Sequence, residues 1–188
     1  MDINIKYVDV KRSEFEDLVL ACYSDGPEAG LLRTGAKGRW TLYVRRMLYE
    51  AEGLCKASKW FASVMDRNNI QQVVAGGFAA VPLIGGILSC GESYKSGAFV
   101  RESRKKYGFR EAIEGSIDKD KEILVVDDIM NTGGACINVL QVMANEGVPM
   151  ENVRVAVLVH FTHGKGDSKL KQVGIKHKLI KAMEITQK

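Results

Sequence analysis

The chain has 188 residues, of which 46% are apolar and 27% charged, and its formal net charge is +4 at pH 7. This composition is ordinary for a globular protein, and the length suits one folded unit with a substantial core. The mild charge argues against a dedicated nucleic-acid binder, and no apolar run approaches the ~18 residues of a membrane span. No secretory leader is apparent and no two cysteines form a C-x-x-C pair, so we expect a cytoplasmic protein with reduced cysteines, without nucleic-acid or membrane partners.

The first half of the chain predicts helices and short strands. Apolar residues recur at helical spacing in residues 52–69, and Pro82 suits the first turn of a helix because its missing N–H has no partner there in any case. The predicted elements are, in order, helix 13–23, strand 40–45, helix 52–69, strand 70–77 and helix 79–91.

The second half predicts strands that alternate with helices and loops. The predicted elements are strand 96–102, polar loop 103–120, strand 122–128, helix 134–147, strand 152–161 and a short final strand 173–180. The lysine-rich residues 165–178 are expected to be the solvated face of an edge strand.

The predicted strands are continuous runs of Val, Ile and Leu rather than alternating patterns. Such runs indicate a parallel sheet buried on both faces, and hence an α/β, doubly wound fold. Ligands of these folds bind beyond the carboxyl ends of the strands. Asp127-Asp128 and Gly76-Gly77 both lie at such ends, so we expect them to face one crevice.

The sequence "DDIMNTGGA" at residues 127–135 joins a strand to a helix. Its small residues leave backbone N–H groups free at the positive end of the helix, which suits a phosphate. Two carboxylates beside that turn would repel a polyphosphate but accept hydrogen bonds from sugar hydroxyls. The pattern therefore favours a sugar phosphate as ligand.

The longer stretch "ILVVDDIMNTGGA" resembles the signature of the type I phosphoribosyltransferases, which bind 5-phosphoribosyl-1-diphosphate (PRPP). Asn131 is the one position that departs from the usual residues. Further segments resemble the orotate phosphoribosyltransferase branch, among them "FVRESRKKYGFREAIEG" and "VVAGGFAAVPL". The resemblance implies one phosphoribosyltransferase domain over residues 1–188, with a core at about 45–162 and a small hood built from about 1–44 and 163–188.

The resemblance also implies roles for individual residues. Asp127, Asp128, Arg101 and Lys105 would be catalytic, Phe161 and Arg33 would contact the base, and Mg²⁺ would arrive with PRPP near the aspartates rather than on a separate protein site. A homodimer active in nucleotide biosynthesis or salvage is implied as well. The PRPP-binding residues would be Asp127, Asp128, Asn131, Thr132, Gly133, Gly134, Ala135, Gly76, Gly77, Phe78 and Ala79.

Several positions depart from the orotate branch. Ala79 stands where that branch has a lysine, Glu102 replaces a lysine, and Tyr107 replaces a histidine. After the strand that ends near His160, the arginine that grips the orotate carboxylate is missing. A carboxylate on the base would lack an obvious partner, so we expect either a base other than orotate or a base that is held differently.

Three hypotheses follow from these patterns. The first is an active phosphoribosyltransferase with a nucleobase acceptor, and the second is a catalytically inactive, PRPP-binding regulatory protein. The third is a doubly wound protein unrelated to PRPP. Two local alternatives also stay open, because the basic loop around Lys105 can be merely solvated and Phe161 can belong to the core. His160 and His163 lack a third ligand at a fitting spacing for a metal.

Overall fold

The computed structural model describes residues 3–25, 40–91, 95–101 and 112–187. Lys105 and Arg33, together with Glu102 and Tyr107, lie outside the described residues. The elements are β1 (Ile3–Tyr7), α1 (Arg12–Ala21), β2 (Tyr23–Asp25), β3 (Trp40–Leu42), the 3-10 helix η1 (Val44–Tyr49), α2 (Ala51–Arg67), β4 (Gln72–Gly76), α3 (Ala80–Cys90), β5 (Ser96–Val100), β6 (Ile113–Glu114), β7 (Ile123–Met130), α4 (Gly134–Asn145), the 3-10 helix η2 (Met150–Asn152), β8 (Val153–Phe161), α5 (Gly166–Gln172) and β9 (Ile180–Gln187).

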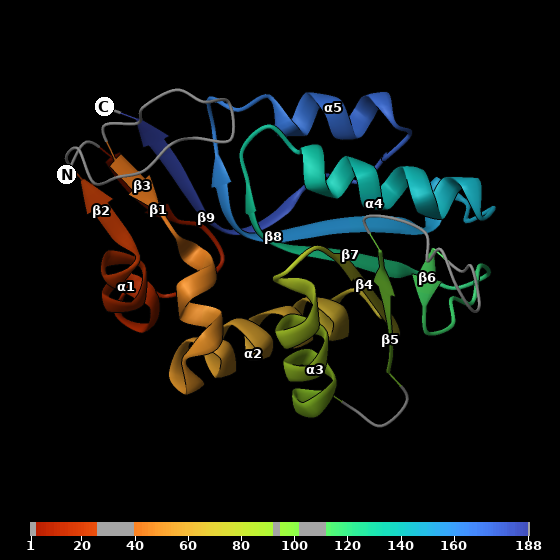
Figure 1. The fold of residues 1–188 in the computed structure, drawn as a ribbon, viewed down its shortest axis with the longest axis horizontal. Coiled ribbons are helices and arrows are strands. Elements are labelled where there is room, and N and C mark those ends of the chain that lie inside the picture. The colour runs from red at the N-terminus through yellow and green to blue at the C-terminus, as the bar shows by residue number, and fades with distance from the viewer. Residues whose placement is uncertain (1–2, 26–39, 92–94, 102–111, 188) are drawn as a thin grey trace.

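A central sheet runs through the molecule in the order β1-β9-β8-β7-β4-β5-β6. The pairs from β9 to β5 are parallel, whereas the edge strands β1 and β6 are antiparallel to their neighbours. Helices α2 and α3 cover one face of the sheet, and α4 and α5 cover the other (Figure 1). The predicted α/β, doubly wound fold is confirmed.

The two faces of the sheet bury separate apolar clusters. One joins the sheet to α1, α2 and α3 through side chains such as Phe61, Leu83 and Leu158. The other joins it to α4 and α5 through Leu140, Met143 and Leu170. Because burial is the main favourable term in folding, these two layers hold the carboxyl ends of the strands in place.

The last part of the chain differs from the sequence prediction. Residues 166–172 form helix α5, and the final strand begins at Ile180 rather than at residue 173, so the predicted strand 173–180 is wrong. Gly166, Leu170 and Ile175 are the buried residues of this stretch, and the exposed lysines around them lie on α5 and the loops beside it rather than on an edge strand. Moreover, β9 is not an edge, because β1 pairs with it.

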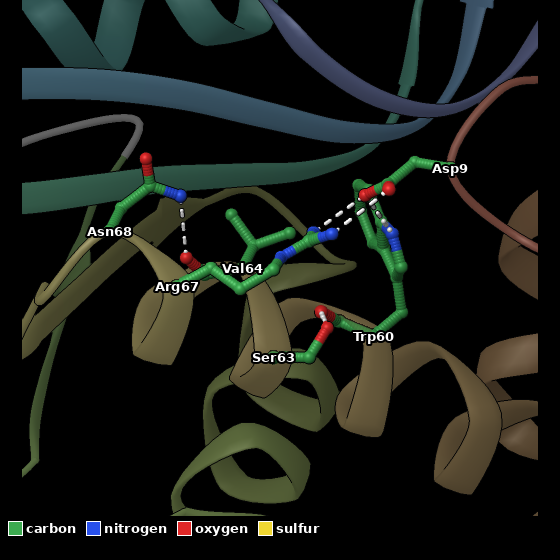
Figure 2. A network of polar contacts seen from close by, with 6 residues as sticks. All are labelled: Asp9, Trp60, Ser63, Val64, Arg67 and Asn68. Carbon is green, nitrogen blue, oxygen red and sulfur yellow. Dashed lines mark hydrogen bonds and ion pairs between the residues drawn. The ribbon is translucent and has the colours of Figure 1, made fainter.

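Both segments that we assigned to a hood contribute to the central sheet, β1 from the first and β9 from the second. The N-terminal segment is further tied to α2 by a polar network around Asp9 (Figure 2). Asp9 accepts hydrogen bonds from the Arg67 guanidinium at 2.6 and 2.9 Å and from Trp60 Nε1 at 3.0 Å. The hydrogen bonds from Arg67 and Trp60 hold the pKa of Asp9 below its usual value. The division into core and hood stays a prediction.

Candidate active site

The strand order reverses between β4 and β7. From β4 the chain moves outward to β5 and β6, while β7, β8 and β9 lie on the other side of β4. In parallel sheets such a reversal opens a crevice at the carboxyl ends of the two central strands. Val74 pairs with Val125, so Gly76 and Asp127, each two residues further on, lie at the same level.

The acidic pair lies within β7 rather than after it, because the strand continues to Met130. Asp128 is only 2% exposed, whereas Asp127 is half-buried. One carboxylate oxygen of Asp127 accepts a hydrogen bond from the Asp128 backbone N–H at 2.9 Å. Burial and the neighbouring charge of Asp128 raise the pKa of Asp127 well above its ordinary value. A ligand hydroxyl or a cation that reached Asp127 would contact a carboxylate that is poorly solvated.

The turn after β7 has the geometry of an anion site. Gly133 is the N-cap of α4 and adopts a φ of 74°, a left-handed conformation that favours glycine. Asn131, Thr132, Gly134 and Ala135 are all exposed around it. The first N–H groups of a helix have no partner within the helix, and its dipole is positive at this end. The turn can therefore receive a phosphate on backbone donors.

Helix α5 supports this turn from behind. A Cβ placed on Gly164 would lie 2.0 Å from the backbone oxygen of Asn131, and one placed on Gly133 would lie 3.3 Å from Cα of Gly166. The two backbones thus pack with no room for a side chain between them. No pattern in the sequence indicates this contact, because it joins the start of α5 to a turn some 30 residues earlier in the chain.

The glycine turn after β4 lies beside the acidic pair. Ala79 is buried at the start of α3, while the side chain of Phe78 is 75% exposed. A cavity of about 470 Å³ lies at this turn. It is lined by Tyr49, Gly77, Phe78, Val81, Pro82, Phe99 and Arg101. Arg101 follows β5, and its guanidinium is paired with Glu114 of β6. The structure thus brings together Arg101, the glycine turn and an apolar pocket.

The sequence prediction missed Arg45, which connects the two halves of the crevice. Its Nε lies 3.8 Å from Oδ2 of Asp128, and its guanidinium carbon lies 5.9 Å from the ring centre of Phe78. The only signal in the sequence was an Arg-Arg pair at the end of the predicted strand 40–45. That pattern could not tell Arg45 from Arg46, which is exposed and pairs with Glu50.

Phe161 lies in the apolar core and is only 5% exposed, which favours packing over contact with a base. His160 is buried, with Nε2 at 3.4 Å from Asp167, and its burial lowers the pKa of the ring. Its Nδ1 has no hydrogen-bond partner among the described residues.

Within the same residues, no group of three or more His, Cys, Asp or Glu side chains could hold a metal ion. No helix in the described ranges is long and apolar enough to cross a membrane.

Comparison with known proteins supports the geometry. The phosphoribosyl transferase domain family matches residues 98–183. An orotate phosphoribosyltransferase of Haloquadratum walsbyi is 30% identical over 146 residues, which cover 76% of this chain and 77% of that protein.

Among solved structures, Mycobacterium tuberculosis orotate phosphoribosyltransferase in complex with Fe(III) dicitrate superposes with a TM-score of 0.74 at 20% identity, over 91% of this chain and 94% of that one. The same enzyme in complex with PRPP superposes with a TM-score of 0.61 at 18% identity, over 74% and 79% of the two chains. With the fold, the DDIMNTGGA turn and these relatives in agreement, the chain belongs to the type I phosphoribosyltransferases, a glycosyltransferase family, and lies close to the orotate phosphoribosyltransferase branch.

Proposed function

We propose that this phosphoribosyltransferase transfers 5-phosphoribose from PRPP to a nucleobase and releases diphosphate. The observation that carries the proposal is that β4 and β7 are parallel neighbours, so the turns that follow them leave the sheet at the same end. Asn131–Ala135 offers backbone donors to a phosphate, and Gly76–Ala79 lies beside Asp127 and Asp128 on the neighbouring strand. PRPP carries a phosphate at one end, a diphosphate at the other and ribose hydroxyls between them. The phosphate would match the turn at residues 131–135, the hydroxyls the acidic pair and the diphosphate the glycine turn.

The reaction then follows from the placement of each group. The 5-phosphate binds the turn at residues 131–135, and the ribose hydroxyls donate to the acidic pair. The bond from C1 to the diphosphate oxygen breaks, and its electron pair leaves with the diphosphate. A nitrogen lone pair of the base forms the new bond to C1, and the proton of that nitrogen passes to solvent. Cations near the departing oxygens favour this step because charge builds up there.

Magnesium fits the carboxylates of the acidic pair when the ligand supplies the remaining oxygens. Mg²⁺ is usually held by one or two carboxylates together with substrate phosphates and water. Asp127 is the accessible member of the pair, whereas Asp128 is nearly inaccessible and faces Arg45. We infer that Asp127 would hold the ion that arrives with PRPP, and that the ion, when bound, would supply positive charge beside the diphosphate.

The acceptor is proposed to be a nucleobase other than orotate. The segment after β8 reads Thr162-His163-Gly164-Lys165 and offers no arginine for a carboxylate. A regulatory protein that binds PRPP without turnover is the second candidate, and it is favoured by Ala79, a small apolar residue in the turn proposed for the diphosphate. A homodimer, which the family resemblance implies, belongs to the same proposal and is tested by sedimentation equilibrium.

The test is titration calorimetry of magnesium and PRPP against the parent protein and the variant Asp127→Asn/Asp128→Asn, with Asp120→Asn, an exposed loop residue, as control. A screen for diphosphate release then covers orotate, uracil, adenine, guanine and hypoxanthine. Binding that is lost in the double variant only, with release for one base, supports the transferase. Binding without release for any base points to the regulator, and absence of binding to the parent rejects both.

A further inference from the structure

Arg45 lies on a rigid part of the molecule. It belongs to η1, whose neighbouring side chains Val44, Met47 and Leu48 are all about 1% exposed. Its own side chain is 32% exposed, so the backbone is anchored while part of the guanidinium reaches the crevice. This combination is what a preorganised ligand contact requires, since a fixed group loses little freedom on binding.

The contacts of Arg45 leave much of its hydrogen-bonding capacity unused. The 3.8 Å between Nε and Asp128 Oδ2 makes an ion pair but is too long for a hydrogen bond. Nε is buried and has no hydrogen-bond partner among the described residues. The guanidinium carries five N–H donors in a planar fork. A buried donor without a partner is unfavourable, so a ligand oxygen that reached it would be bound with a real gain.

The position of Arg45 indicates which part of PRPP it would contact. Its guanidinium faces the ring of Phe78, which is a member of the glycine turn. The other described cation at this turn, Arg101, is paired with Glu114, although its buried Nε, like that of Arg45, has no hydrogen-bond partner among the described residues. A guanidinium matches two phosphate oxygens through parallel hydrogen bonds.

We propose that Arg45, which forms an ion pair with Asp128, binds the diphosphate of PRPP and stabilises it as it leaves. The inference rests on the proposed function of the crevice, and it gives that function a cation at a turn where Ala79 supplies none. Arg45 acts by donating hydrogen bonds and transfers no proton.

The experiment compares Arg45→Gln and Arg45→Lys with Arg46→Gln, the neighbouring residue, whose side chain is 66% exposed and pairs with Glu50 instead. Each protein is titrated with PRPP and magnesium, with ribose 5-phosphate, and with magnesium diphosphate. For Arg45→Gln we expect PRPP and diphosphate to bind about 10- to 100-fold more weakly, the loss of a hydrogen bond to a charged group. Ribose 5-phosphate, which lacks the diphosphate, should change by less than about threefold, and Arg46→Gln should bind all three like the parent.

The outcomes separate this inference from the proposed function. If the parent binds PRPP and Arg45→Gln binds it equally well, the role of Arg45 is refuted while the function stands. If Arg45→Gln weakens PRPP and ribose 5-phosphate by the same factor, Arg45 only shapes the site and the inference also fails. If the parent binds none of the ligands, the function itself is wrong. Arg45→Lys keeps the charge without the fork, so an intermediate loss for diphosphate alone supports the proposal even if Arg45→Gln does not fold.

Discussion

Replacing Gly164 by alanine tests the contact between the start of α5 and the turn at residues 131–135. The added Cβ would lie 2.0 Å from the Asn131 backbone oxygen and 2.3 Å from its side-chain oxygen. Ordinary contact begins at 3.4 Å, so one of the two backbones must move by more than an ångström. Overpacking of this kind costs about 1–3 kcal/mol of unfolding free energy. In a chain of this length each kcal/mol corresponds to about 2–4 °C in Tm.

The same movement should weaken phosphate binding, because the groups of an enzyme site act only when correctly placed. A displacement of about 1 Å can reduce the rate of the enzyme about 100-fold. We therefore expect Gly164→Ala to lower Tm by about 6 °C and the affinity for ribose 5-phosphate at least about tenfold. The assays are differential scanning calorimetry and ligand titration.

Gly85→Ala is the matched control, since nothing lies within 4 Å of the added Cβ in α3. It should raise Tm by about 2–3 °C through helix propensity and leave binding unchanged. A Gly164→Ala protein with parental Tm and parental affinity would refute the supporting role of α5.

Three further predictions follow from burial and charge. Asp127→Asn removes a carboxylate whose pKa is raised by burial, so the ionised form destabilises the folded parent as pH rises. The free energy of unfolding of the variant should exceed that of the parent by about 1 kcal/mol at pH 8 and by almost nothing at pH 4. Thermal denaturation at both pH values measures this difference, and an equal gain at both would contradict the prediction. Asp9→Ala loses bonds that lower the pKa of Asp9, so with solvent screening it should cost about 1 kcal/mol at pH 7 and less at pH 3 in the same assay. Leu140→Ala, at a fully buried position, should cost about 3 kcal/mol in urea denaturation, and a loss below ~1 kcal/mol would show that the site collapses.

Controls for these variants are available in the chain. Arg12→Ala breaks an exposed ion pair with Glu16 and should leave Tm unchanged, unlike Asp9→Ala. Asp120→Asn removes an exposed carboxylate and should show no pH-dependent gain.

The central part of the fold could be predicted from sequence because its signals are local. The apolar run before Asp127 and the small residues after it specify strand, turn and helix within a few positions. The segment after β8 was predicted wrongly because its lysines surround single buried residues, Leu170 and Ile175, which fit neither period clearly.

The composition of the crevice depends on contacts between distant parts of the chain, and sequence spacing does not report these. Arg45 meets Asp128 across 83 positions of the chain, and the choice between it and Arg46 is made by the packing of η1. The burial of Asp128 likewise depends on β7 continuing to Met130. The sequence prediction ended this strand at the acidic pair.

The pairing of β1 with β9 has a consequence for how the molecule is made. Ile3 lies opposite Gln187, so β1 can pair with its neighbour only after the distant strand β9 has been synthesised. Contacts between such distant positions slow folding, because a very long loop must close before they form. In the described sheet β9 lies between β8 and β1, so β1 has a hydrogen-bonding neighbour only once β9 is in place.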